Sequence, residues 1–293
     1  MDDTLRNVTL GLFAFFALHV SLEPRARHGA ERQLREAFNQ TGTVHAAVRQ
    51  RGLLGYEAND IWSVDVYGRE QTIDRLPFVI VPREGWKGSI HRLSLHLMDF
   101  TLAGLPVHRF DADLPNVGYD LGHAFYKSRL VIRGAGIGSG IVVINRTGLN
   151  TFLARKFGNL LSDVNFVSNQ NIISLDGKLD LFGSPTSFKA KGQIKIRGGR
   201  CLDLTEAEIL LDDKPLTAQA TEALMKRINP LLDIERDLKL GGIFFIDRVE
   251  VGDGDITIFG RVSLPILRTI EKPDPNQDDL PVPHQVENSG SNQ

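Results

Sequence analysis

The chain contains 293 residues with a mass of 32.5 kDa, which is enough for one large domain or two small ones. Apolar residues make up 42% and charged residues 24%, and this ordinary globular balance excludes disorder along the whole chain. The net charge of −2 disfavours a protein dedicated to binding nucleic acid. The single cysteine, Cys201, excludes an internal disulfide and a cysteine-rich zinc site.

The N-terminal residues contain a continuous apolar run from Val8 to Leu22. This run is shorter than the about 20 residues of a bilayer-spanning helix, so it suits a signal-peptide core or a shallow membrane anchor. Asp2 and Asp3 stand where a signal peptide carries basic residues, and no small-x-small cleavage site follows the run. Basic residues are denser after the run than before it, which favours a cytoplasmic body. We expect residues 1–24 to attach the protein to a membrane of the cell envelope. The side of that membrane stays open, and the alternative is a buried N-terminal helix.

The residues after this anchor are expected to form one folded body and then a tail. Arg27–Phe38 has the spacing of a helix, and residues 25–268 should form a single α+β domain. Residues 269–293 combine polar residues with several prolines, which predicts a disordered, solvated tail containing Pro273, Pro275, Pro281 and Pro283.

Within the body, short extended runs alternate with two amphipathic segments. Strands are predicted at Ile61–Tyr67, Phe78–Val81, Ile90–Leu97 and Ile141–Ile144. Helices are predicted at Thr147–Leu161, behind a threonine cap, and from Thr217 to about Ile228. The second helix should end before Pro230, because the residue preceding a proline resists helical geometry. The pattern lacks the βαβ alternation of doubly wound folds and favours a long meandering antiparallel sheet with three helices.

Two β-hairpins are predicted from strict alternation of apolar and polar residues. Ile173–Leu181 and Phe188–Ile196 would pair across a loop at Gly183–Thr186, with Leu181 opposite Phe188. The same register pairs Leu179 with Ala190, Leu175 with Ile194, Ile173 with Ile196, and Gly177 with Gly192. In the second hairpin, Val249 and Val251 should face Ile258 and Ile256 across the turn Gly252–Asp255.

The sequence contains no recognisable catalytic or metal-binding motif. The glycines of Gly134–Gly140 lead into a strand rather than a helix, so they predict a turn and not a phosphate loop. The Gly252–Asp255 turn lacks the spaced ligands of a calcium loop. His91 and His96 should point to opposite faces of one strand, and no nucleophile elbow is present. We therefore expect no enzyme activity, no metal and no cofactor.

A basic row on the second strand of the first hairpin allows two interpretations. It could be a solvated outer face, partly neutralised by Asp180 opposite Lys189. It could instead face the headgroups of anionic lipids at a membrane. The row consists of Lys189, Lys191, Lys195 and Arg197.

The order of these features resembles a known family over roughly Arg32 to Leu264. A strand opening Gly88-Ser89-Ile90 and the stretch Asp111–Asp113 come first. The segment Thr147-Gly148-Leu149-Asn150 then opens a helix, and a later helix ends in Arg227-Ile228-Asn229-Pro230-Leu231-Leu232-Asp233 before the closing hairpin. This order is similar to that of the LmeA-like phospholipid-binding family of bacteria. The resemblance implies a strongly curved antiparallel sheet wrapped along a helix, similar to one half of the tubular lipid-binding (TULIP) proteins. It also implies an apolar groove and supplies no catalytic residues.

The functional expectation is non-enzymatic binding or transfer of a phospholipid or another acyl lipid at a membrane. The alternative is a structural envelope protein that makes protein contacts without lipid. Glycines in mid-strand would serve a bend of the hairpin or leave room for an acyl chain. The residues expected to line the groove share one apolar face: Phe152, Leu153, Phe157, Leu175, Gly177, Leu179, Phe188, Gly192, Ile194, Leu224 and Ile228.

Overall fold

The computed structural model describes residues 31–32, 35, 41–50, 60–74, 80, 87–120, 123, 131–158, 160–169, 172–181 and 184–264. The proposed anchor at 1–24 and the tail at 269–293 lie outside the described residues. Of the predicted helix Arg27–Phe38, the described residues are Glu31, Arg32 and Arg35, and all three are helical. Of the predicted strand Phe78–Val81, only Ile80 is described, and it forms an isolated bridge.

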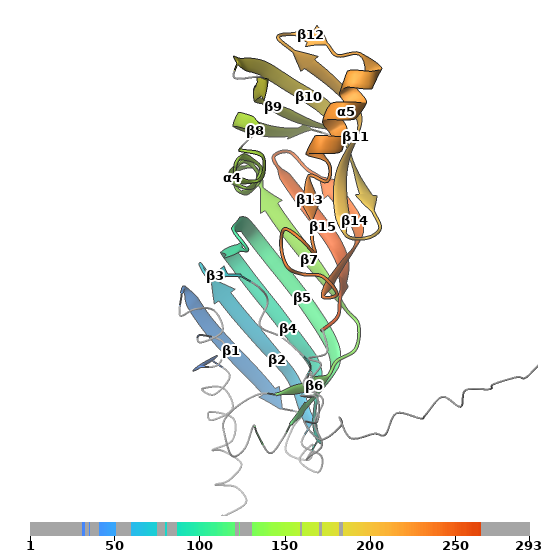
Figure 1. Ribbon diagram of the computed structural model, residues 1–293. Helices are drawn as coiled ribbons and strands as arrows, with labels where there is room; N and C mark the ends of the chain where they lie inside the picture. The colour runs from blue at the N-terminus through green and yellow to red at the C-terminus, as the bar shows by residue number, and fades with distance from the viewer. Residues whose placement is uncertain are drawn as a thin grey trace, which may run out of the picture.

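The described chain is mostly β-sheet, with 65% of it in strands, and it contains two helices, which fits the expected α+β class. The strands form two sheets rather than the single meander that the sequence predicts. The first sheet has nine strands in the order β1-β2-β4-β5-β7-β15-β14, with β3 beside β4 and β6 beside β5 (Figure 1). Its strands are β1 (Thr43–Gln50), β2 (Asp60–Arg69), β3 (Thr72–Ile73), β4 (Lys87–Leu102), β5 (Leu105–Asp120), β6 (Ile132–Gly134), β7 (Gly138–Asn145), β14 (Phe244–Val251) and β15 (Asp255–Val262).

This nine-stranded sheet is mixed, which corrects the expectation of a purely antiparallel sheet. β2 and β3 run parallel to β4, and the other neighbours are antiparallel. The physical reason is the connection: residues 70–86 separate β2 from β4, and a connection of that length can return the chain to start a parallel strand.

The second sheet has six strands and is antiparallel throughout. Its order is β12-β11-β10-β9-β8, with β13 beside β11. Its strands are β8 (Leu161–Asn169), β9 (Ile172–Leu181), β10 (Ser184–Arg197), β11 (Cys201–Leu211), β12 (Lys214–Pro215) and β13 (Leu232–Asp233).

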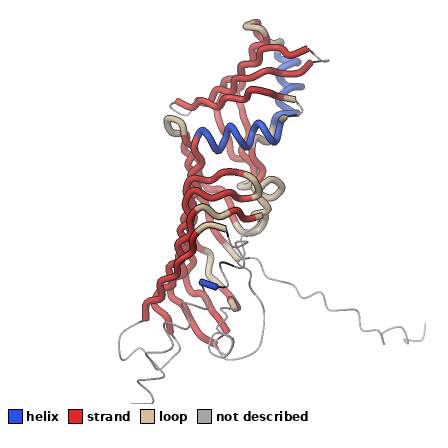
Figure 2. Tube along the Cα trace, turned by 90° about the vertical axis from the view of Figure 1, so that its left-hand side faces the viewer, coloured by secondary structure: helices blue, strands red, loops and turns tan. Residues whose placement is uncertain are grey.

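The two helices differ in how well the sequence predicts their ends. α4 spans Arg146–Phe157, and its cap is Asn145, whose side chain accepts a hydrogen bond from the Gly148 amide at 2.8 Å, rather than Thr147. It stops before the expected Leu161 because that residue begins β8. α5 spans Ala218–Ile228, close to the expected bounds, and Thr217, the expected first residue, is its cap. Figure 2 shows α4 crossing between the two sheets and α5 along one side of the six-stranded sheet.

The register of the β9–β10 hairpin differs from the expected one by four residues. Leu181 pairs with Ser184, and Phe188 pairs with Gly177. The turn therefore contains only two residues between the paired strands, the commonest hairpin connection. Because four is an even number, the same side chains still face the interior, so the faces were predicted correctly although the partners were not.

This register separates the two mid-strand glycines, and each proves to face a β-bulge in its other neighbour. The β8–β9 ladder skips from Ser162 to Asn165 opposite Gly177, and the β10–β11 ladder skips opposite Gly192. A Cβ at Gly177 would lie 2.9 Å from the Ser162 carbonyl oxygen, and one at Gly192 would lie 2.6 Å from the Thr205 carbonyl oxygen. The glycines thus accommodate backbone that bulges toward them, which favours the bend over room for an acyl chain.

The other predicted turns are confirmed. Val249 pairs with Ile258 and Val251 with Ile256, on either side of the turn at 252–255. The glycine-rich stretch lies between β6 and β7. A further tight turn of three residues, Gly198 to Arg200, joins β10 to β11, and its two glycines have positive φ of 62° and 66°, a region that favours glycine.

We expect Gly192→Ala to destabilise the protein by about 1–3 kcal/mol, because the added methyl group would overlap the Thr205 carbonyl. The matched control is Gly134→Ala, since a Cβ there meets nothing within 4 Å and should change stability by less than about 0.5 kcal/mol. Urea denaturation of both variants measures the difference. Equal stability of the two would mean that the bulge contact does not exist.

Candidate functional site

The residues predicted to line a groove do come together, but as packed interior. Phe152, Leu153 and Phe157 lie on α4, while Leu224 and Ile228 lie on α5. Eight of the nine apolar residues belong to one core and are at most 9% exposed, and Ile194 packs against that core partly buried. These described side chains are packed into one cluster rather than spread along an open groove. The β-sheet members of this set are Leu175, Leu179, Phe188 and Ile194.

Between described residues, small cavities are found that follow one another through the interior, and three of them carry the argument. The first lies against β4, β5, β7 and β15 and includes Phe110, Ile144 and Leu232 in its lining. The second shares Phe110 and extends along β4 and β5, and the third shares Ile144 and Leu232 and reaches α4 and the six-stranded sheet. All three are lined by apolar side chains, and each has a volume of about 20 Å³, room for about one water molecule.

One irregular segment covers the first of these cavities. The segment Leu231–Ile243, called the strap below, includes the two residues of β13 and is otherwise made of turns. The strap is folded partly on itself, with Leu240 N donating to Ile234 O at 3.0 Å and Asp237 N to Asp233 O at 2.8 Å. Its aliphatic side chains face the interior, and they are Leu231, Leu232, Ile234, Leu238, Leu240 and Ile243, each 2–6% exposed.

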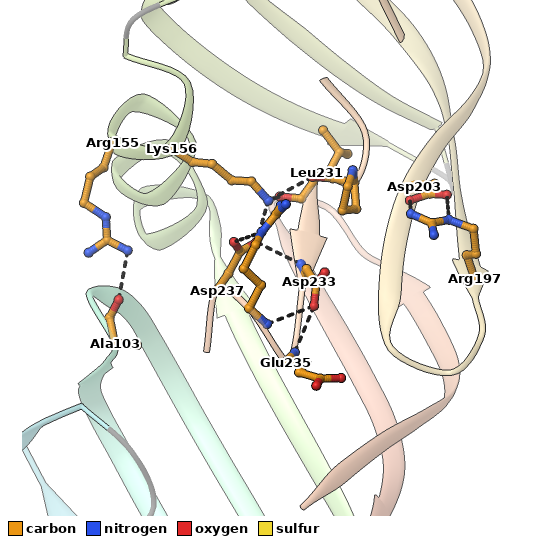
Figure 3. A network of polar contacts seen from close by, with 11 residues as sticks. Ala103, Arg155, Lys156, Arg197, Asp203, Leu231, Asp233, Glu235 and Asp237 are labelled. Carbon is orange, nitrogen blue, oxygen red and sulfur yellow. Dashed lines mark hydrogen bonds and ion pairs between the residues drawn. The ribbon is translucent and has the colours of Figure 1, made fainter. Parts of the chain in front are cut away.

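A buried ion pair joins the strap to α4 (Figure 3). The Lys156 ammonium group donates to the Pro230 carbonyl at 2.9 Å, to the Leu231 carbonyl at 3.2 Å and to the Asp237 carboxylate. The two side chains are 13% and 11% exposed. Burial lowers the pKa of Lys156, and the Asp237 carboxylate opposes that shift. Asp237 also accepts from the Asp233 amide at 2.9 Å, so the carboxylate ties the strap to α4 and to itself.

The first turn of the strap is organised by Asp233. Its carboxylate accepts from the amides of Glu235 and Arg236, each at 3.0 Å. Burial acts to raise the pKa of Asp233, but these two amide donors outweigh it and the pKa is lowered. Cys201 is its cross-strand partner, and burial followed by the negative charge of Asp233 raises the pKa of the thiol. A thiol of raised pKa is a poor nucleophile, which fits a packing role for Cys201.

Two asparagines fix the elements around the cavities, and the sequence analysis assigned them no role. The Asn229 side chain makes two hydrogen bonds of 2.8 Å with the amide and carbonyl of Leu204, so it acts like one more strand residue beside β11. The Asn150 side chain accepts from the Phe166 amide of β8 at 2.6 Å. Both asparagines belong to the motifs that carry the family resemblance. For Asn229, its position directly before Pro230 was the sequence signal that could have indicated a structural role.

The basic row of β10 is neutralised by carboxylates. Lys189 contacts Asp213 at 2.7 Å, Lys195 contacts Glu206 at 3.0 Å, and Arg197 contacts Asp203 at 2.5 Å. Lys191 lies opposite Glu208 in the ladder with β11. The residue opposite Lys189 on β9 is Asp176 and not Asp180 as expected, because of the shifted register. This arrangement favours the solvated outer face over contact with anionic headgroups.

The histidines of the nine-stranded sheet pair with carboxylates rather than with one another. His91 contacts Asp60 at 2.9 Å, and His96 contacts Asp111 at 2.7 Å. Among the described residues, no group of three or more His, Cys, Asp or Glu side chains is placed to hold a metal ion. In the same part of the chain, no helix is long and apolar enough to cross a membrane.

Comparisons of this chain with protein-family models, with curated proteins and with solved structures give no match.

We expect Asp237→Asn to destabilise the protein by about 3 kcal/mol, because it leaves the buried Lys156 ammonium without its counter-charge. The deficit relative to the unsubstituted protein should shrink as the pH rises toward 10.5, the ordinary pKa of lysine. Over that range the unfolded chain holds a proton on Lys156 that the folded variant has released, so stability rises with pH.

The matched control is Glu222→Gln, which breaks the exposed Lys226–Glu222 pair on α5 and should leave stability almost unchanged. Thermal unfolding of the three proteins between neutral and alkaline pH measures both effects. A deficit that grows with pH would contradict the assignment of a buried lysine charge.

Proposed function

We propose that this protein binds the acyl chains of a phospholipid or a related lipid in its apolar interior, without catalysis. The observation that supports the proposal most directly is the series of three apolar cavities running from β4 and β5 to the six-stranded sheet. An interior of this kind offers an acyl chain apolar contacts along its length, each buried methylene contributing about 0.8 kcal/mol.

The cavities are far smaller than an acyl chain, so binding requires side chains or a covering segment to move. The cover of the first cavity is the strap, which is irregular apart from the two residues of β13, and its irregular part is easier to displace than a long strand of either sheet. Apolar lining without polar groups selects for hydrocarbon, and a headgroup would stay at the surface.

The resemblance to the LmeA-like family supports the same proposal and extends it to the finer fold. In this proposal, the nine-stranded sheet, α4 and the strap correspond to one half of a tubular lipid-binding protein. The apolar run Val8–Leu22 would hold the protein at the membrane of a bacterial cell envelope, from which it could take or to which it could deliver lipid.

A structural role in the envelope is the second candidate, and it has its own observation. The predicted groove residues are packed, while Tyr67 and Met98, on neighbouring strands of the nine-stranded sheet, are each 44% exposed. Tyr67 stacks on His96 with the ring centroids 5.1 Å apart. Exposed aromatic and methionine side chains of this kind are typical of protein interfaces.

Lipid extraction and native mass spectrometry of the purified protein, before and after incubation with phospholipid vesicles, separate the two candidates. Bound phospholipid in the native spectrum supports the proposed function. A protein that carries no lipid and takes up none from vesicles overturns it and leaves the structural role.

We expect Ala112→Val to weaken lipid binding about fourfold, because the side chain lines the second cavity and the larger residue removes the room of about one methylene group, worth about 0.8 kcal/mol. Ala47→Val is the matched control, since Ala47 is half-buried on β1 and lines none of the three cavities described above. Titration with a fluorescent phospholipid compares the two variants. Equal affinities would place the bound lipid elsewhere.

We expect removal of residues 1–24 to release a soluble, folded protein from membranes, because the apolar run attaches the body without belonging to its core. Flotation with vesicles and circular dichroism check both parts of this prediction. Aggregation or unfolding of the truncated chain would instead make the run part of the core.

A further inference from the structure

We propose that the strap, Leu231–Ile243, is a displaceable occupant of the lipid site, so that an acyl chain binds in the place now filled by the strap's own aliphatic side chains. This inference rests on the proposed function and deepens it, because it names the surface that receives the chain. That surface is formed by β4, β5, β7 and β15.

The side chains of the strap occupy this surface in the manner of a hydrocarbon ligand. Leu232, Ile234, Leu238 and Leu240 line the first cavity together with residues of the nine-stranded sheet such as Phe110. All four are at most 4% exposed. Removing them would uncover a continuous apolar surface joining the three cavities, and covering that surface again with an acyl chain would offset the cost of exposing it.

The backbone of the strap is attached mainly at its two ends. At the start, β13 pairs with β11, and Ile234 N donates to Arg200 O at 3.0 Å. At the end, Ser263 donates to the carbonyls of Ile243 and Gly242, both at 2.8 Å. The middle of the strap has few hydrogen bonds to other elements within the described residues. Lys156 of α4 donates to Asp237, and Arg200 donates to Glu235 in an exposed pair.

Two glycines, Gly241 and Gly242, precede the last residue of the strap, which suits a hinge. Gly242 has a φ of 76°, a conformation that other residues rarely adopt, and a Cβ there would meet nothing within 4 Å. A backbone dihedral change at Gly242 would let the middle of the strap move while Ser263 still holds Ile243. Its closed position is held by the Lys156–Asp237 ion pair.

The chain offers a direct test, because Cys201 of β11 is the cross-strand partner of Asp233 in the strap. Ile234 N bonds to Arg200 O, so the neighbouring pair Cys201–Asp233 is a non-hydrogen-bonded pair. The Cα atoms of such pairs lie about 4.5 Å apart, within the range that a disulfide requires. In Asp233→Cys, oxidation with copper phenanthroline should join the two thiols and prevent the flanking Leu232 and Ile234 from leaving the cavity.

Uptake of a pyrene-labelled phospholipid from donor vesicles is measured for Asp233→Cys before oxidation, after oxidation and after reduction with dithiothreitol. We expect oxidation to slow uptake about tenfold or more and dithiothreitol to restore it. The control is Asp233→Cys combined with Cys201→Ser, in which the oxidant has no internal disulfide to form and should leave uptake unchanged. Mass spectrometry under denaturing conditions confirms the disulfide.

Oxidised and reduced Asp233→Cys that take up lipid at the same rate would overturn the strap proposal and leave the proposed function intact. Failure of the unsubstituted protein to take up lipid would overturn the proposed function itself. The two failures are therefore distinguishable.

A second pair of variants tests the same gate without a cross-link. Lys156→Met removes the ion pair that holds the strap and should raise the rate of lipid uptake several-fold in protein shown to be folded by circular dichroism. Arg155→Met is the matched control, because Arg155 donates to the Ala103 carbonyl at 2.9 Å, away from the strap. Equal uptake rates for the two variants would count against the gate.

Discussion

The structure depends on one constraint: each of the two sheets has an apolar face, and both faces must be buried in a shared interior. β15 of the nine-stranded sheet and β10 of the six-stranded sheet alternate buried and more exposed residues, so each sheet has an apolar face that requires cover. α5 and part of α4 pack against the six-stranded sheet. Among the described elements, the strap and the rest of α4 cover the nine-stranded sheet. Figure 2 shows described loops lying along one side of this sheet.

Side chains rather than ladders connect the parts where the two sheets meet. Asn229 and Asn150 each bond to the backbone of a strand, and Ser168 of β8 bonds to the carbonyl of Gly252 and the amide of Gly254 in the β14–β15 turn. These bonds satisfy backbone groups that the ends of strands and turns leave unpaired. Lys156 likewise satisfies the carbonyls of Pro230 and Leu231 where the strap begins. Because its ammonium group is charged, loss of the partner Asp237 would weaken this attachment.

A lipid-binding protein and a structural protein would share most of this architecture. The difference lies in the strap, because a permanently closed strap completes a solid core, whereas a displaceable strap converts the same apolar surface into a site. The glycines of β9 and β10 do not help to decide between the two roles, since each faces a bulge of the neighbouring strand. The close approach of the bulged backbone accounts for their presence without a ligand.

Local alternation and capping residues determined much of the fold from the sequence alone. They identified β9, β10, α5 and the β14–β15 hairpin, and they assigned Phe188, Leu175 and Leu224 to the interior, because periodicity depends only on neighbouring residues. The tertiary structure decided the partners. It set the β9–β10 register through a two-residue turn, returned β4 parallel to β2, and divided the strands into two sheets. It also placed the strap in the interior beside Lys156. These outcomes depend on contacts between residues far apart in the chain, and the pattern along one segment carries no information about which distant segment will cover it.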